Sequence, residues 1–304
     1  MASRMSAVAF VKTEDRASGV RRALDLLGVP SVKGRELFLK PNFNSADATP
    51  GSTHNDVLRT LVEYLRAMGA SRVTIGDRSG MGDTRSVMER KGVLRMAEEI
   101  GFEVVVLDEL PADAWSKCQP EGSHWQHGFA VPRLVLGADG VVQTCCLKTH
   151  RFGGHFTLSL KNGVGLAAKR IPGDPHDYMH ELHSSPHQRL MIAEVNAAYH
   201  PDLIVLDGVE ALTEGGPDQG KKVKARVVLA GADRVAMDAV GVALLRYHGT
   251  TPAVSQGAIF GLEQIARAVE LGLGVHSPAE IELVSDDPDS KAYADEIRRV
   301  LDAG

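Results

Sequence analysis

Short apolar runs alternate with amphipathic stretches over the first hundred residues, and this alternation constrains the fold more than any other feature. The runs 72–78 (RVTIGDR) and 102–108 (FEVVVLD) have the length and β-branched content of buried strands. The stretch 53–70, which precedes the first of these runs, repeats apolar residues at helical spacing. Strands that alternate with helices usually pair in parallel. We therefore predict an α/β fold built from βαβ units, with a mostly parallel sheet and helices on both faces.

The same alternation continues through the second half of the chain. Further strands are predicted at 140–150, 201–208, 225–232 and 281–287, and further helices at 184–200, 233–249 and 290–304. With 304 residues, 43% of them hydrophobic, the chain can bury a large core. We predict one unit over 1–304 and leave open a division into two α/β lobes, about 1–145 and 146–304. Residues 109–128 hold both tryptophans without a clear period, which indicates an excursion or a lid.

Composition excludes several classes of protein. A net charge of -5 argues against a nucleic-acid-binding protein. No apolar run approaches the roughly 18 residues of a membrane span. Three cysteines without a CxxC pair predict no disulfide framework, and they favour a cytoplasmic location. Residues 1–18 are interpreted as leading into a first strand rather than as a secretion signal. A homo-oligomer remains open.

Polar residues follow the predicted strands, where ligands bind in open parallel sheets. These residues are Lys40, Asn42, Asp77, Arg78, Lys148, His150 and Asp207. Because parallel strands end at one edge of a sheet, we expect these side chains to converge on a site. The alternative is that these residues are polar only because loops after strands are exposed to solvent.

The stretch 146–169 (CLKTHRFGGHFTLSLKNGVGLAAK) is the densest in such residues. The two-residue period of a strand puts Lys148 and His150 on one face. Glycines at 153 and 154 permit a tight turn. We expect Thr157 to cap a short helix that carries Lys161 and Asn162, with free N–H groups that bind an anion. The predicted partner is a small carboxylate or phosphate.

Histidines gather just after this stretch. Helical spacing would place His176, His180 and His183 on one face, where imidazoles could bind a divalent transition metal. The alternative is a solvated histidine-rich loop, since HExxH is absent. GxxxxGK[ST] is absent too, and no GxGxxG follows the first strand, so neither phosphate-binding fingerprint is present. The identity of any cofactor therefore stays open.

Four motifs resemble the domain of unknown function 362 family. They are LKPNF, LKTHRFGGHFTLSLKNGVG, LDGVEALTEGGPDQG and AGADRVAMDAV, in the order found in that family, over roughly residues 35 to 245. The resemblance implies an α/β fold. Many relatives carry a ferredoxin-like iron–sulfur module, but this chain lacks its cysteines, so that cofactor is not carried over.

A remoter segment resembles the lactate racemase catalytic subunit family, in which a lysine anchors a nickel pincer nucleotide. The pattern of histidine, glycine, hydroxyl and lysine matches His150, Gly154, Thr157 and Lys161. The DTR sequence at 83–85 is similar to a phosphate-binding element and implies that Thr84 and Arg85 contact a ligand. Ser159 and Leu160 depart from the glycines of that family, so the pincer cofactor is not carried over.

Two functions follow from these residues. The first is an enzyme, isomerase-like or oxidoreductase-like, that acts on a small anionic metabolite. Lysines 40, 148 and 161 would hold the anion, His150 would exchange a proton near neutral pH, and Asn42 and Asn162 would position the ligand. Asp207 would orient a cation. The second is a non-catalytic carrier of an anion or metal, or a partner of an iron–sulfur redox protein.

Overall fold

The computed structural model describes residues 5–304, and a ten-stranded sheet forms the centre of this part of the chain. Eight strands lie in the order β12-β1-β11-β9-β7-β2-β3-β4, while β10 pairs with β9 and β8 pairs with β7. The strands are β1 (Ser6–Lys12), β2 (Glu36–Lys40), β3 (Arg72–Asp77), β4 (Glu103–Val106), β7 (Gly140–His150), β8 (His155–Thr157), β9 (Leu203–Gly215), β10 (Gly220–Val223), β11 (Val227–Gly231) and β12 (Ile281–Val284). Strands from both halves of the chain therefore share one sheet.

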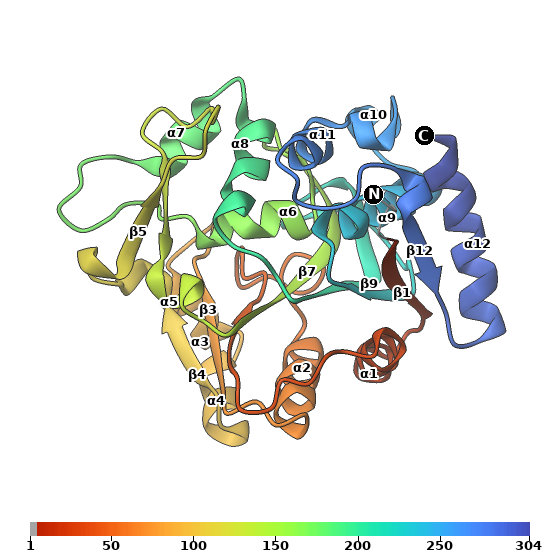
Figure 1. Cartoon of the computed structure of the whole chain (residues 1–304), viewed down its shortest axis with the longest axis horizontal. Helices are drawn as coiled ribbons and strands as arrows, with labels where there is room; N and C mark the ends of the chain where they lie inside the picture. The colour runs from red at the N-terminus through yellow and green to blue at the C-terminus, as the bar shows by residue number, and fades with distance from the viewer. Residues whose placement is uncertain (1–4) are drawn as a thin grey trace.

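Helices cover both faces of this sheet, as the sequence predicts (Figure 1). The longer ones are α1 (Arg16–Leu27), α2 (Asn55–Ala67), α3 (Thr84–Arg90), α4 (Val93–Ile100), α7 (Tyr178–Ser184), α8 (Gln188–Val195), α9 (Arg234–Tyr247), α11 (Glu263–Glu270) and α12 (Pro288–Ala303). The single-turn helices are α5 (Arg133–Leu136), α6 (Ser159–Asn162) and α10 (Pro252–Ser255). Figure 1 shows α1, α2 and α4 below the sheet and α6, α8 and α11 above it.

Alternating residues along the strands explain why both faces are covered. In β1, Val8 and Phe10 belong to the core cluster that includes α9, whereas Ala9 and Val11 belong to the cluster that includes α1 and α2. Successive strand side chains point to opposite faces, so an all-apolar strand must be buried on both sides. Short apolar runs without polar alternation thus predicted this arrangement correctly.

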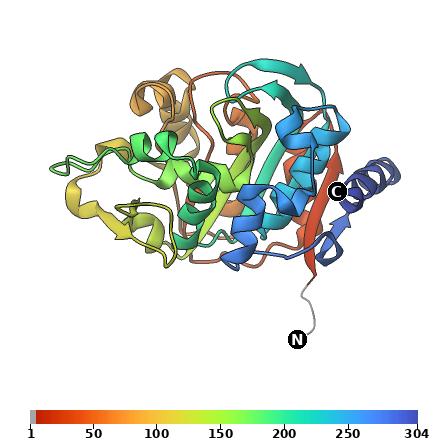
Figure 2. The same cartoon turned by 90° about the horizontal axis from the view of Figure 1, so that it is seen from above.

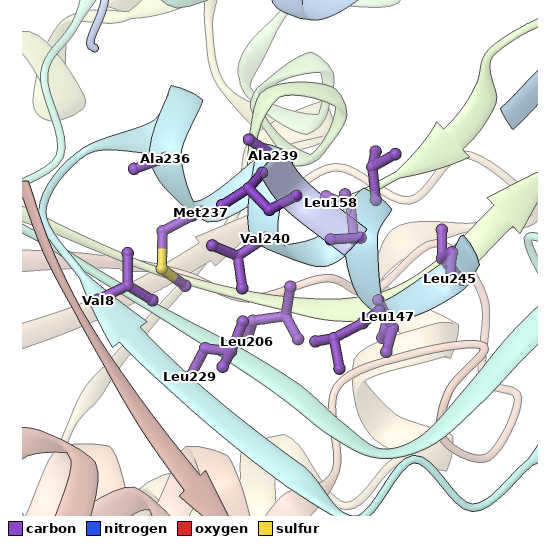
Figure 3. Close-up of a cluster of buried hydrophobic side chains, with 14 of the residues drawn as sticks. Val8, Leu147, Leu158, Leu206, Leu229, Ala236, Met237, Ala239, Val240 and Leu245 are labelled. Carbon is purple, nitrogen blue, oxygen red and sulfur yellow. The ribbon is translucent and has the colours of Figure 1, made fainter. Parts of the chain in front are cut away.

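The core above the sheet is centred on α9. Figure 3 shows Val8, Leu206 and Leu229, from three strands, below Met237 and Val240 of that helix. All five side chains are completely buried. Burial of such a side chain contributes about 1.5–3 kcal/mol. This packing fixes α9, whose Asp238 holds the start of α6 in the site described below.

Residues 109–128 form an excursion at one end of the molecule. They include β5 (Trp115–Cys118), which pairs antiparallel with β6 (Phe129–Pro132) in a separate two-stranded sheet. Trp125 is buried, and its Nε1 donates to the carbonyl oxygen of Met191 in α8 at 3.1 Å. Figure 2 shows this segment and α12 at opposite ends of the molecule.

Four neighbouring strands, β4, β3, β2 and β7, run parallel. Their carboxyl ends therefore meet at one edge of the sheet, where the site lies. No helix in residues 5–304 is long and apolar enough to cross a membrane.

Candidate functional site

A cavity of about 1000 Å³ opens at the carboxyl ends of β2, β3, β4 and β7. Six of the side chains that line it are lysine or arginine and three are aspartate. The strand-end residues among them are Lys40, Asp77, Arg78, Asp108, Lys148 and His150; Thr157, Lys161, Asn162 and Lys169 come from the stretch after β7, and His180 and His183 from α7. The convergence expected of residues from separate strands is present, because parallel pairing brings those strand ends together.

Lys40 and Asp77 form a buried ion pair on the cavity floor. The Lys40 Nζ lies 2.7 Å from Asp77 Oδ1 and also donates to the carbonyl oxygen of Pro41 and to Asn162 Oδ1. Burial lowers the pKa of Lys40 and raises the pKa of Asp77, while the opposite charge of each partner acts against both shifts. All three N–H groups of the Lys40 ammonium are thus used within the protein, so none of them is left to bind an anion.

Two asparagines connect this pair to Lys148. Asn162 Oδ1 accepts from Asn42 Nδ2 at 3.2 Å, and Asn162 Nδ2 donates to the backbone oxygen of Thr144 at 3.0 Å. Asn42 Oδ1 accepts from the Lys148 Nζ at 2.8 Å. These bonds fix the orientation of both amides. The polar side chains of the floor are therefore linked to one another by hydrogen bonds.

Lys148 and Arg78 keep their positive charges without a carboxylate in contact. The Lys148 Nζ donates to two neutral acceptors, Asn42 Oδ1 and the Gly51 carbonyl at 2.5 Å. Burial lowers the pKa of Lys148 to about 8. Arg78 donates to the carbonyl oxygens of Val164 and Ala167. Neither residue forms an ion pair with any of residues 5–304.

Lys161 has no polar partner among residues 5–304. Its side chain lines the cavity, and no acceptor in the described part of the chain lies within hydrogen-bond distance of its Nζ. Burial, together with the charges of Arg78 and Lys148, lowers the pKa of Lys161 to about 7. A lysine beside other cations in a desolvated pocket is partly unprotonated near neutral pH, and its amine can then accept a proton or act as a nucleophile.

His150 and Thr157 each present an unsatisfied polar atom. The Nδ1 of His150 and the Oγ1 of Thr157 are buried and have no hydrogen-bond partner among the described residues. Burial, with the charges of Lys161 and Lys148 nearby, lowers the pKa of His150 far below its usual range. This imidazole stays neutral near pH 7, contrary to the expectation that it exchanges its proton there. Buried polar atoms without partners cost free energy, so such atoms at a cavity are suited to a ligand.

The hairpin from β7 to β8 explains the glycines of this stretch. His150 pairs with His155 across a turn in which Gly153 has φ +80°, a conformation that favours glycine. Gly154 is needed for space: a Cβ there would lie 2.8 Å from Lys161 Cε and 3.0 Å from His150 Nδ1. The side chains of Lys161 and His150 therefore both occupy the space beside residue 154 that a larger residue would fill.

Gly154→Ala is expected to displace the Lys161 side chain from His150 and to cost about 1 kcal/mol of unfolding free energy, the low end for overpacking, because the end of a lysine side chain is flexible. The matched control is Gly261→Ala, whose new Cβ would meet only Ala258 Cβ, at 3.7 Å. Urea denaturation of both variants measures the difference. Equal stability of the two variants would contradict this account of Gly154.

The start of α6 differs from the prediction. Leu158, not Thr157, precedes the helix, and the cap comes from Asp238 of α9. Asp238 Oδ1 accepts from the Ser159 N–H at 2.7 Å and the Ser159 hydroxyl at 2.6 Å, and its Oδ2 accepts from the Leu160 N–H at 3.2 Å. These N–H groups are thus occupied and do not bind an anion. Burial raises the pKa of Asp238 to about 7, although its donors act against the shift.

The three histidines predicted to bind metal do not form a metal site. The described residues hold no group of three histidine, cysteine or carboxylate side chains placed to bind an ion. The helix α7 begins only at Tyr178, so His176 lies before it and its Nε2 contacts Glu181 Oε2 at 2.7 Å. His180 and His183 instead line the wall of the cavity.

Besides Gly154, three predicted ligand-binding residues lie outside the cavity lining. Thr84 is buried and donates to Asp108 Oδ2 at 2.5 Å, while the exposed Arg85 pairs with Glu109. Asp207 is mid-strand, because β9 runs on to Gly215 instead of ending at residue 208. Strand alternation turns its side chain towards α1, where it accepts from Arg16 Nε at 2.8 Å.

Sequence reasoning missed several residues that shape the cavity. Asp238 had no sequence signal of its own, because it lies 79 positions from Ser159. Gly165 makes room for the ion pair on the floor, since a Cβ there would lie 2.6 Å from Lys40 Nζ. Asp108 and Lys169 form an ion pair on the cavity wall at 3.2 Å. The rule that selected residues after strands could have found Asp108, which follows β4 closely.

Comparison with known proteins places this chain in a family. A family model described as "Domain of unknown function (DUF362)" matches residues 37–243, more than half of the chain. The chain belongs to this family. The prediction from the four sequence motifs is thereby confirmed. All residues named above as lining the cavity lie inside the matched range.

Two individual proteins are similar to this DUF362 chain. A thylakoid-associated protein of Synechocystis sp. is 25% identical over 254 residues, which cover 82% of this chain and 74% of that protein. The lactate racemase apoprotein of Thermoanaerobacterium thermosaccharolyticum is 16% identical, with a TM-score of 0.44. That match covers 76% of this chain and 54% of the solved one, so this chain spans about half the length of that structure.

Proposed function

We propose that this protein is an enzyme that acts on a small anionic metabolite, a carboxylate or a phosphate, bound in the cavity. One observation carries the proposal: Arg78, Lys148 and Lys161 line the cavity without a carboxylate in contact among residues 5–304. The chain as a whole has a net charge of -5, so this local excess of positive charge opposes the overall balance. Cations in a desolvated pocket bind anions more strongly than cations in water.

The environment of Lys161 favours catalysis over simple carriage. An anion carrier needs fixed charges, whereas a pKa of about 7 lets Lys161 gain and lose a proton at neutral pH. In this proposal Arg78 and Lys148 hold the anion and Lys161 exchanges the proton. The neutral His150 and the Thr157 hydroxyl hydrogen-bond to the ligand. Asn42, Asn162 and the Lys40–Asp77 pair keep these groups in place.

Metabolite profiling tests this proposal against many candidate substrates at once. The purified protein is incubated with a mixture of small carboxylates and phosphate esters, and mass spectrometry measures which compounds are consumed. Lys161→Met serves as the inactive variant, and Lys33→Met, on an exposed lysine, is the matched control. We expect the wild type and the control to convert at least one anion that the Lys161 variant leaves unchanged.

Calorimetric titration with phosphate and with acetate, on the same proteins, separates the two functions. Binding without any conversion would favour the carrier. If neither anion binds, both the enzyme and the carrier function are wrong.

We also propose a cytoplasmic location. Cys118, Cys145 and Cys146 are all unpaired, and the latter two are buried in β7. Free thiols persist in a reducing compartment. Fractionation of cells that produce the protein checks this, and recovery with the membrane fraction at low and high salt would contradict it.

A further inference from the structure

The lysines around the cavity differ in how many hydrogen bonds their ammonium groups already donate to the protein. Lys40 donates to Asp77, Asn162 and Pro41, which uses all three of its protons. Lys148 donates to Asn42 and Gly51, and Lys169 pairs with Asp108. Lys161 is the only one of these four lysines without a hydrogen bond to any described residue. Its amine is therefore free to react rather than to hold the structure.

The surroundings of this amine are those of a nucleophile. Lys161 Cε and His150 Nδ1 both lie against the position of a Cβ on Gly154, which places imidazole and amine next to each other. The Oγ1 of Thr157 and the Nδ1 of His150 are buried without partners among the described residues. Two further cations, Arg78 and Lys148, line the same cavity and disfavour protonation of the amine. A partly unprotonated amine beside other cations is the arrangement that forms imines with carbonyl groups.

We propose that Lys161 forms an imine with the carbonyl carbon of a 2-oxo acid whose carboxylate is held by Arg78 and Lys148. This inference rests on the proposed function, because it names the class of anion and the bond that the site forms with it. A 2-oxo acid is the smallest ligand that offers an anion and an electrophilic carbon on adjacent atoms.

The step balances in atoms and electrons. The lone pair of the Lys161 amine adds to the carbonyl carbon, and one of the two amine protons passes to the carbonyl oxygen, which gives a neutral carbinolamine. The nitrogen then loses its second proton, the C–N bond becomes a double bond, and the hydroxyl group leaves with that proton as one water molecule. Nothing is oxidised or reduced. The Thr157 hydroxyl and the neutral His150 ring offer hydrogen bonds to the carbinolamine oxygen, which matches their unsatisfied atoms.

Reductive trapping tests the inference. The protein is incubated with pyruvate and cyanoborohydride, which reduces an imine to a stable secondary amine, and intact-mass and peptide mass spectrometry locate the adduct. We expect one reduced pyruvate adduct per chain, on Lys161. Lys161→Met should lose this adduct, and Lys148→Met should slow its formation at least tenfold because the carboxylate is held less well. The exposed control Lys33→Met should be trapped like the wild type.

Binding is measured separately, by calorimetry with pyruvate and with acetate, which has the carboxylate but no ketone. If both anions bind and no adduct forms on Lys161, the imine is excluded while the anion-binding function stands. If the adduct persists in Lys161→Met or spreads over surface lysines, the assignment to Lys161 is wrong. If neither anion binds, the proposed function itself fails.

Discussion

Asp238→Ala should lower the free energy of unfolding by about 4 kcal/mol at pH 5, the largest effect we expect of a substitution outside the cavity lining. The change removes the acceptor of the Ser159 N–H, the Leu160 N–H and the Ser159 hydroxyl, all of which are buried. Each buried donor left without a partner costs about 1–3 kcal/mol. The helix α6 would lose its cap, and Lys161 and Asn162, which it carries, would lose their positions.

The effect should shrink as the pH rises. Burial raises the pKa of Asp238 to about 7, above its value near 4 in an unfolded chain. The folded state then binds the proton more tightly, so the resulting stability is fully present below pH 4 and is lost as the pH rises through 7. Between pH 5 and pH 8 the difference between wild type and Asp238→Ala should fall by about 2 to 3 kcal/mol. Urea denaturation at both pH values measures it.

Asp287→Ala is the matched control. Asp287 accepts from the N–H groups of Asp289 and Ser290 and from the Ser290 hydroxyl, but it is partly exposed and lies at the start of α12, outside the cavity lining. Hydrogen bonds from Ser290 lower the pKa of Asp287, so its contribution is lost only on acidification. We expect a cost of about 1 kcal/mol, as for other helix caps, unchanged between pH 5 and 8. Parallel behaviour of the two variants would contradict the role given to Asp238.

Anion affinity should fall about ten- to a hundredfold when the pH rises from 6 to 9, the second large effect. The pKa is lowered to about 7 in Lys161 and to about 8 in Lys148, so both amines are protonated at pH 6 and mostly neutral at pH 9. A hydrogen bond from a charged donor to an anion contributes about 1.5–3 kcal/mol, of which deprotonation removes most. Acetate is a suitable probe, because its own charge does not change over this range.

The Lys161→Met variant sharpens this measurement. Without the amine, the part of the transition near pH 7 should disappear, and only the part near pH 8 should remain. Calorimetric titrations at half-unit pH intervals resolve the two. An affinity that is constant from pH 6 to 9 would show that neither lysine changes its charge there, and would remove the basis for proton exchange by Lys161.

Local sequence patterns were enough to predict that helices cover both faces of a central sheet. Apolar runs without polar alternation, such as the one that became β1, require burial on both faces, and they predicted helices on each side of a mostly parallel sheet. The rule that ligands bind beyond the carboxyl ends of parallel strands placed Lys40, Lys148 and His150 at one cavity. The rule failed for Asp207, because the end of β9 depends on its pairing with β10 and not on a local turn.

Electrostatic roles, in contrast, depended on contacts between distant segments. Four lysines line the cavity, yet Asp77 neutralises Lys40 and Asp108 pairs with Lys169, while Lys148 and Lys161 keep no carboxylate partner among residues 5–304. Burial, which no local pattern reports, lowers the pKa of His150 and made it neutral instead of a proton carrier. The histidine spacing failed for a related reason: Asp177 caps α7 and leaves His176 before the helix.

The sequence by itself determined the alternation of the long strands and helices, the family, and the glycine turn between β7 and β8, because periodicity, motif order and backbone freedom are local properties. Only the tertiary structure decided which cations stay unpaired, which helix start is occupied by Asp238, and that Gly154 leaves room for Lys161 beside His150. Charge pairing and steric space are set by residues far apart in the chain, so they exist only once the chain has folded.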